Sequence, residues 1–206
     1  MDGPFLLILT GPPGAGKTTV GHAVAKRFHP SVCIESDWFW TTITNGFVKQ
    51  WLAEADPQNQ TVIRSFVAAA ARMVVGGYHA VLEGVIGPWY LDLVRDELAA
   101  VGLSAYYVVL RPDLATCLSR STGRGQSERV PGHPPLTDEG PIRQMWNAFA
   151  DLGNYEGHVL DTSNSTESET VGALVDLLHR GGRDLLLDRI ISSPGMERPI
   201  MGCAQI

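Results

Sequence analysis

Residues 11–18 read Gly11-Pro12-Pro13-Gly14-Ala15-Gly16-Lys17-Thr18. They follow the apolar run 5–10, which is typical of a buried parallel strand, and they precede a helix predicted from about Lys17 to Phe28. A Gly-x-x-x-x-Gly-Lys-Thr pattern between a strand and a helix is the setting in which this spacing forms a phosphate-binding loop. The stretch therefore predicts a strand–loop–helix unit that binds a nucleoside triphosphate.

The loop residues have separate chemical roles in this prediction. Glycines allow backbone N–H groups to surround phosphate oxygens at the positive end of the helix dipole. Lys17 reaches the outer phosphates, where it would act catalytically, and the Thr18 hydroxyl can ligate Mg²⁺. We expect residues 11–18 and Thr19 to bind ATP, with Mg²⁺ as the second cofactor. The loop alone does not tell whether the phosphoryl group passes to water or to an acceptor, because both classes use it.

The composition limits the fold and the partners. The chain has 206 residues and is 44% hydrophobic, which suits one α/β domain with a single buried core. A formal charge of -6 gives no basic bias, so we expect neither a nucleic-acid partner nor binding to an anionic membrane. The cysteines lack ligand spacing, and the chain has no apolar run long enough for a bilayer and no targeting segment at its start. We expect a soluble, cytoplasmic protein.

Apolar runs and amphipathic segments alternate along the chain. Strands are predicted at 5–10, 32–34, 80–82, 105–110 and 158–160, and helices at 17–28, 62–76, 90–101, 114–121, after 137, and at 167–180. The alternation predicts an α/β fold of the P-loop NTPase type, with a five-stranded parallel sheet flanked by helices. We assign residues 1–182 to this domain, with a mobile lid at about 121–136, and leave 183–206 as a tail of unknown role.

Two acids close the second predicted strand, in the sequence Glu35-Ser36-Asp37. The carboxyl ends of strands in an open parallel sheet face the ligand crevice, and residues two apart on a strand share a face. We predict that Asp37 is the catalytic base, which orients an acceptor hydroxyl and takes its proton late in phosphoryl transfer. The alternative is that Asp37 only caps a helix that starts at Trp38.

Glu83 ends the third predicted strand, directly before Gly84. In P-loop proteins an acid at this place holds Mg²⁺ directly or through water, so Thr18 and Glu83 are the candidate metal ligands. A solvated carboxylate at the end of a strand is the alternative. Whether Glu35 also helps to hold the metal stays open.

Arginines lead into the predicted lid. Arg120 and Arg124 are four residues apart, hence on one face of a helix, and Arg129 lies beyond them. A lid that carries arginines over the triphosphate would neutralise charge on the transferring group and expel water. We therefore predict catalytic roles for Arg120 and Arg124, with Arg120 also binding the nucleotide. The alternative is a set of solvated surface arginines.

The fifth predicted strand runs into a loop that precedes the last helix. We expect Thr162 and Ser163 in this loop to border the adenine, with backbone groups reading the base. Ser165 and Thr166 can in addition cap the helix that starts at Glu167.

Together these segments resemble the chloramphenicol phosphotransferase-like branch of P-loop kinases over roughly residues 5–180. The resemblance is carried by the 11–18 loop, the acids at 35–37, the segment 81–84, the arginine lid and the stretch 155–163. It implies that an Asp after the second strand acts as the base, which maps onto Asp37. The chain also resembles shikimate and gluconate kinases in architecture, although Glu35 stands where the paired acids of shikimate kinase have Asp.

Aromatic residues dominate the segment that follows Asp37. They are Trp38, Phe39, Trp40, Phe47 and Trp51. Kinases of small anionic acids need several basic residues around the acceptor, whereas only Lys49, Arg64 and Arg72 lie between Asp37 and Gly84. An acceptor pocket lined by aromatic rings is therefore expected, and core packing of these rings is the alternative.

The sequence thus predicts an ATP-dependent phosphotransferase that moves the γ-phosphoryl group to a hydroxyl of a small, partly apolar molecule, such as an antibiotic or secondary metabolite. One alternative is a kinase of a metabolite such as shikimate or a sugar acid. Another is a nucleotide-switch ATPase, which would need neither Asp37 nor an acceptor pocket. The identity of the acceptor, the preference for ATP or GTP, and the oligomeric state stay open.

Overall fold

The computed structural model describes residues 3–123, 136–182 and 185–187. Its strands are β1 (Leu6–Thr10), β2 (Ser31–Glu35), β3 (His79–Glu83), β4 (Ala105–Leu110) and β5 (Val159–Leu160). The α-helices are α1 (Lys17–Ala25), α2 (Asp37–Trp40), α3 (Asp56–Val75), α4 (Leu91–Ala99), α5 (Leu114–Thr122), α6 (Glu139–Ala148) and α7 (Glu167–Arg180). Short 3₁₀ turns are η1 (Ala53–Ala55), η2 (Pro88–Tyr90) and η3 (Gly153–His158).

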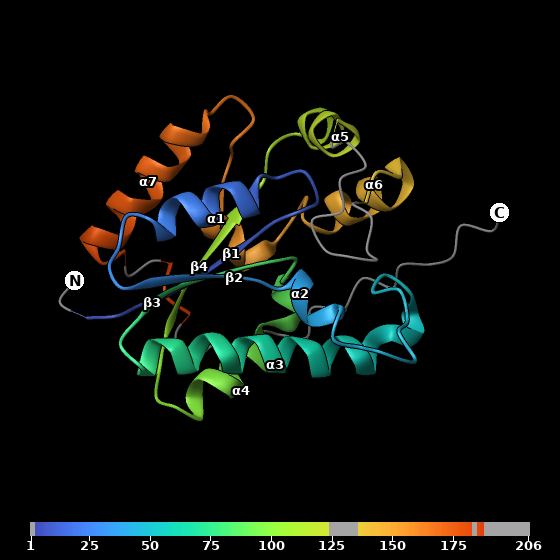
Figure 1. Cartoon of the computed structure of the whole chain (residues 1–206). Coiled ribbons are helices and arrows are strands. Elements are labelled where there is room, and N and C mark those ends of the chain that lie inside the picture. The colour runs from blue at the N-terminus through green and yellow to red at the C-terminus, as the bar shows by residue number, and fades with distance from the viewer. Residues whose placement is uncertain (1–2, 124–135, 183–184, 188–206) are drawn as a thin grey trace.

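The five strands form one parallel sheet in the order β2-β3-β1-β4-β5. Figure 1 shows α1 and α7 on one face of this sheet and α3 and α4 on the other. This arrangement confirms the predicted α/β fold with a five-stranded parallel sheet flanked by helices.

The central strand β1 explains why both faces are covered. Leu6 and Ile8 belong to a core cluster with residues of α3 and α4, whereas Leu7 and Leu9 belong to a second cluster with residues of α1 and α7. Side chains alternate between the two faces of a strand, so a continuous apolar run must be buried on both sides. The sequence of β1 therefore requires helices on each face.

The outer edge of β4 is covered by more than one part of the chain. β5 pairs only with Val109 and Leu110, at the carboxyl end of β4. Nearer its start, Leu186 forms an antiparallel bridge with Tyr106, and the Leu187 N–H donates to the Ala105 carbonyl at 2.9 Å. Residues 185–187, which the sequence analysis left without a role, thus pair with the sheet.

No helix in the described parts of the chain combines the length and the apolar character that crossing a bilayer requires.

The turn after β1 generates a prediction about stability. Gly11 has a φ of 142°, and a Cβ placed on it would lie 2.1 Å from the Leu110 carbonyl oxygen. Because this neighbour is backbone and cannot swing away, we expect Gly11→Ala to lower the free energy of unfolding by about 1–3 kcal/mol or more. Denaturant unfolding followed by circular dichroism measures the change.

Gly172→Ala is the matched control, because a Cβ on this glycine in α7 would meet no heavy atom within 4 Å. We expect it to be neutral or to stabilise the protein by about 0.5–1 kcal/mol, through the higher helix propensity of alanine. Equal stability of the two variants would contradict the contact at Gly11.

Candidate active site

The phosphate loop has the backbone conformation that its glycines predicted. Gly11, Gly14 and Gly16 all have positive φ, and the Ala15 N–H donates to the Pro12 carbonyl at 3.2 Å. Lys17 Nζ donates to the same Pro12 carbonyl at 3.0 Å. The lysine charge is therefore held over the loop, where outer phosphates would bind.

Thr18 and Glu83 form the contact at the centre of the site. Thr18 Oγ1 donates to Glu83 Oε1 at 3.0 Å, and Glu83 is only 3% exposed. The pKa of the Glu83 carboxyl is raised, mainly because the group is buried. The Lys17 charge opposes this rise, and the Asp37 charge adds to it. A hydroxyl oxygen and a carboxylate oxygen are ligands that suit Mg²⁺, so this pair fits the expected metal.

The described residues contain no group of three or more His, Cys, Asp or Glu side chains that could hold a metal ion. A cage of protein ligands is thus missing from this part of the chain. Mg²⁺ often binds through one or two protein ligands together with substrate phosphates and water. The Thr18–Glu83 pair at the phosphate loop matches that mode of binding.

The end of β2 runs beside the end of β3. Glu35 is in register with Glu83, and the Ser36 N–H donates to the Glu83 carbonyl at 2.9 Å. Asp37 is exposed and is the first residue of α2, whereas Ser36 occupies the N-cap position. Asp37 therefore lies inside the first turn and not at the cap, where its charge can still favour the helix N-terminus, and its role as the base stays a prediction.

Helix α5 packs directly against the phosphate loop. A Cβ on Gly14 would lie 2.2 Å from the Cys117 carbonyl oxygen and 2.7 Å from Ser121 Oγ. Arg120 is exposed on this helix, and it is close enough for its charge to oppose the burial that raises the pKa of Cys117 to about 11. Arg120 thus lies on the helix that contacts the loop, and its role toward the nucleotide stays a prediction. Arg124, Arg129 and most of the predicted lid lie outside the described residues.

The loop after β5 is held by its own side chains. Ser163 Oγ donates to Asp161 Oδ1 at 2.5 Å and accepts from the Asp113 N–H at 2.8 Å. Thr162 is buried, and its hydroxyl has no hydrogen-bond partner among the residues that the structure describes. Thr166 caps α7 with a reciprocal capping box to Glu169. The loop is well defined, and adenine contacts by Thr162 and Ser163 stay a prediction.

Sequence reasoning missed Arg111, which directly follows β4. Its guanidinium donates to both carboxylate oxygens of Glu156 at 2.8 Å, and to the carbonyls of Phe149 and Ala150 at 2.8 and 3.1 Å. This fork ties the end of α6 and the turn η3 to the carboxyl end of the sheet. An arginine at a strand end is the one signal that the sequence offers. It does not reveal the role of Arg111, because the partners lie about 40 residues away in the chain.

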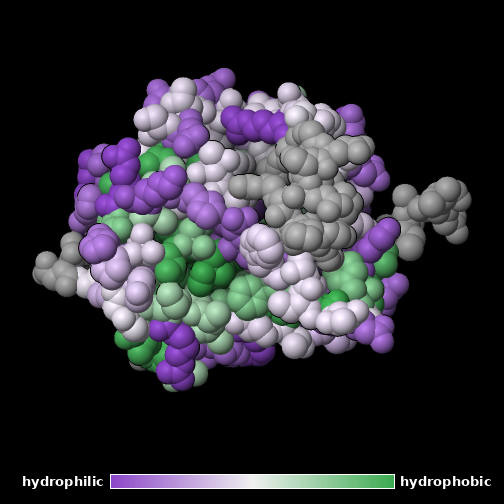
Figure 2. Space-filling model, viewed as in Figure 1, coloured by the Kyte–Doolittle hydropathy of each residue, from purple (hydrophilic) through white to green (hydrophobic). Residues whose placement is uncertain are grey.

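The aromatic residues after Asp37 divide between core and surface. Trp40 is buried and Phe39 packs edge to face on Phe66, whereas Trp38 is 47% exposed and Phe47 is 37% exposed. Figure 2 shows hydrophobic surface among polar residues on the side where the segment between α2 and α3 lies. Some of the rings therefore fill the core, and an acceptor pocket lined by the others stays a prediction.

Polar side chains of α3 fix the segment that carries Phe47. Gln58 donates to the Val48 carbonyl at 2.7 Å and accepts from the Val48 N–H at 2.8 Å, and Asn59 donates to the Gln50 carbonyl at 2.8 Å. These amide contacts replace the backbone pairing that an irregular segment lacks. The segment is therefore held against α3 by specific bonds.

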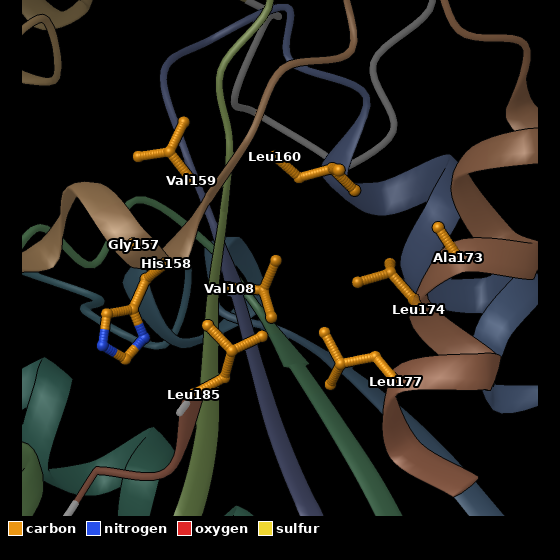
Figure 3. Close-up of a pocket in the computed structure, with 9 residues that line it drawn as sticks. All are labelled: Val108, Gly157, His158, Val159, Leu160, Ala173, Leu174, Leu177 and Leu185. Carbon is orange, nitrogen blue, oxygen red and sulfur yellow. The ribbon is translucent and has the colours of Figure 1, made fainter. Parts of the chain in front are cut away.

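A separate cavity lies between β4, β5 and α7 (Figure 3). Its volume is about 120 Å³, and aliphatic side chains such as Val108, Leu174 and Leu177 point into it. It contains none of the candidate site residues. Ligand pockets are usually about 300–1,000 Å³, so this cavity is too small for an acceptor.

Comparison with known proteins identifies relatives of this fold. A family model described as AAA domain matches residues 7–132. Among solved structures, the tunicamycin resistance protein of Deinococcus radiodurans aligns with a TM-score of 0.63 and 19% identity, over 85% of this chain and 95% of that chain. A sugar kinase from Janibacter sp. aligns with a TM-score of 0.60 and 19% identity, over 85% and 95% of the two chains.

A shikimate kinase from Bacteroides thetaiotaomicron aligns with a TM-score of 0.58 and 16% identity, over 85% of this chain and 98% of that chain. The sequence matches no curated protein sequence. At these identities the likeness establishes a shared fold, and it confirms the predicted P-loop fold.

The Arg111–Glu156 pair generates a prediction about pH. The hydrogen bonds from Arg111 lower the pKa of Glu156 from 4.5 to about 2. A lowered pKa in the folded state stabilises the protein above the unfolded value of 4.5, and this stabilisation is lost as the pH falls through about 2. Glu156 is 42% exposed, so after allowance for solvent screening we expect Glu156→Gln to cost on the order of 1 kcal/mol at pH 7.

Thermal unfolding at pH values from 7 down to 2 measures this effect. The stability gap between wild type and Glu156→Gln should shrink below about pH 4.5. Glu139→Gln is the control, because the Glu139–Arg143 pair is exposed on both sides and should change stability by ~0.5 kcal/mol or less. A gap that stays constant with pH would assign the effect of Glu156→Gln to packing.

Proposed function

The chain belongs to the AAA domain family, and we propose that it transfers the γ-phosphoryl group of ATP to a hydroxyl of a small, partly apolar molecule. The observation that carries this proposal is the separation of two acids at one edge of the sheet. Glu83 is buried against Thr18, whereas Asp37 is exposed and still close enough to raise the pKa of Glu83. A bare nucleotide switch would need only the first of these acids.

Each residue of the site has a role in the proposed reaction. Lys17 places its charge on the outer phosphates, and Thr18 with Glu83 would hold Mg²⁺, which supplies neutralisation of phosphate charge when bound. Backbone N–H groups of residues 11–18 orient the triphosphate, as positive φ at Gly14 and Gly16 allows. Positioning and charge are the main contributions that a phosphoryl-transfer enzyme can make.

Asp37 completes the proposed reaction on the acceptor side. A bond forms between the acceptor oxygen and the γ-phosphorus, and the bond between this phosphorus and the β–γ bridging oxygen breaks. The hydroxyl proton passes to the Asp37 carboxylate, and ADP leaves with the electron pair of the broken bond. Since the transition state is loose, Asp37 needs only to orient the hydroxyl first and to take the proton late.

The surroundings of Asp37 support an acceptor that is partly apolar. Trp38 follows Asp37 and is half exposed, and Phe47 lies on the segment that Gln58 fixes. Arg64, one of the three basic residues considered for an anionic acceptor, is instead bound to Asp96 and Glu97 at 3.0 and 2.8 Å. This contact favours the proposed acceptor class over shikimate or a sugar acid.

An antibiotic or a related secondary metabolite is our proposed acceptor. The resemblance of the sequence to chloramphenicol phosphotransferase-like kinases supports it, and so does the structural likeness to a protein named for tunicamycin resistance. We further propose residues 1–182 as the kinase domain, a lid at about 121–136, and a cytoplasmic location. Cys33 and Cys117 are free thiols, which suits a reducing compartment.

Asp37→Asn decides between the kinase and a bare ATPase. The amide keeps the shape and a hydrogen-bonding group but cannot accept the proton, so we expect acceptor phosphorylation to fall by ~100- to 10,000-fold while nucleotide affinity persists. Calorimetry with ADP and Mg²⁺ measures affinity. Acceptor-dependent ADP release, screened over hydroxyl-bearing antibiotics, sugar acids and nucleosides, measures transfer.

The paired measurement separates three results. Equal transfer by wild type and Asp37→Asn would remove Asp37 as the base. Loss of nucleotide affinity would assign Asp37 to the metal site. ATP hydrolysis that no acceptor accelerates, in either protein, would favour the nucleotide switch.

Arg120 should act on the nucleotide and not on the fold. It is exposed on α5 beside the phosphate loop, so we expect Arg120→Ala to slow transfer by about 100-fold and to change the free energy of unfolding by ~0.5 kcal/mol or less. Arg180→Ala is the control, because Arg180 is 81% exposed on α7. A large drop in melting temperature with normal kinetics would reverse this assignment.

A further inference from the structure

His22 lies one turn after Thr18 on α1, and sequence reasoning assigned it no role. Residues four apart on a helix project on the same side, so Thr18 and His22 both reach toward the strands β2 and β3. His22 Nε2 lies 2.7 Å from Glu35 Oε1, and the Glu35 side chain is 18% exposed. The same face of one helix thus contacts the acids of two adjacent strands.

The two acids are neighbours in the sheet. Glu35 and Glu83 are in register on β2 and β3, and the charge of Glu35 raises the pKa of Glu83. Registered residues of adjacent strands place their side chains on the same face of the sheet. Two carboxylates therefore share one side of the site, and α1 supplies a partner for each: Thr18 for Glu83, and His22 for Glu35.

The packing between α1 and the sheet leaves little room for other arrangements. Gly21 lies between Thr18 and His22 on α1. A Cβ on this glycine would lie 3.3 Å from Cys33 Sγ and 3.6 Å from Glu83 Cβ. Burial, with the charges of Glu83 and Glu35, raises the pKa of the Cys33 thiol to about 12, so it stays neutral beside the acids. The helix is therefore seated closely enough for its side chains to fix both carboxylates.

We propose that His22 is a positioning residue, which holds the Glu35 carboxylate beside Glu83 so that Glu35 supports the bound divalent ion from outside its direct ligands. This inference rests on the proposed nucleotide and metal site. Outer partners of this kind orient the direct ligands and the water around a metal, and their loss weakens metal binding by ~10- to 100-fold in known sites. Glu35 then has a role different from that of Glu83, which contacts Thr18.

The test measures Mn²⁺ binding to the full chain in the presence of ADP, by electron paramagnetic resonance, and needs no acceptor. We expect His22→Ala and Glu35→Gln each to raise the Kd for Mn²⁺ about tenfold. His22→Gln should restore binding to within about twofold of wild type, because its amide N–H can donate to Glu35 from a similar position. The double variant His22→Ala/Glu35→Gln should lose no more than either single change.

Lys26→Ala is the matched control, since Lys26 is exposed and lies four residues beyond His22, at the C-cap of α1. It should leave the Kd for Mn²⁺ unchanged. An unchanged Kd in His22→Ala, with ADP still bound, would overturn the positioning role and leave the proposed function standing. Additive losses in the double variant would overturn it as well. A wild-type protein that binds no ADP would instead contradict the proposed function, and the inference with it.

Discussion

The backbone of the phosphate loop lies directly against the end of β4 and against α5, and both contacts depend on glycine. Any side chain on Gly11 would meet the Leu110 carbonyl, and any side chain on Gly14 would meet the Cys117 carbonyl. The loop is thus held between the carboxyl end of β4 and the helix that carries Arg120. The candidate phosphate loop therefore contacts both β4 and α5 closely.

The carboxylates at the carboxyl edge of the sheet have different surroundings. Acids gather at the ends of β2 and β3, and each is fixed by a different neighbour, with Thr18 on Glu83 and His22 on Glu35. Of the three acids Glu35, Asp37 and Glu83, only Asp37 is exposed. Lys17 is bound to the loop itself, so its charge opposes the acids from the phosphate side. The first six residues of α1 therefore supply the side chains that contact the loop carbonyl, Glu83 and Glu35.

The sequence predicted the strands well because each is a compact apolar run, and β4 and α7 have the predicted bounds. It placed the start of α3 at Val62, whereas the helix begins at Asp56, because its first turns are polar and show no apolar face. The phosphate loop could be found from its spacing, and the acids and Arg120 are proposed from their places at strand ends and before the lid, so that their roles stay predictions. Arg111 and His22 could not, because their partners are distant in sequence or lie on another element, and only the folded chain brings them together.

The covering of β4 bears on how the molecule behaves toward other copies of itself. With β5 only two residues long, most of the outer edge of β4 would offer unpaired N–H and C=O groups to any passing strand. Leu187 occupies the Ala105 carbonyl, Leu186 bridges Tyr106, and the His158 ring lies 2.9 Å from the Tyr107 carbonyl oxygen. A chain shortened before residue 185 would thus keep its phosphate loop and yet expose a template for intermolecular pairing and aggregation.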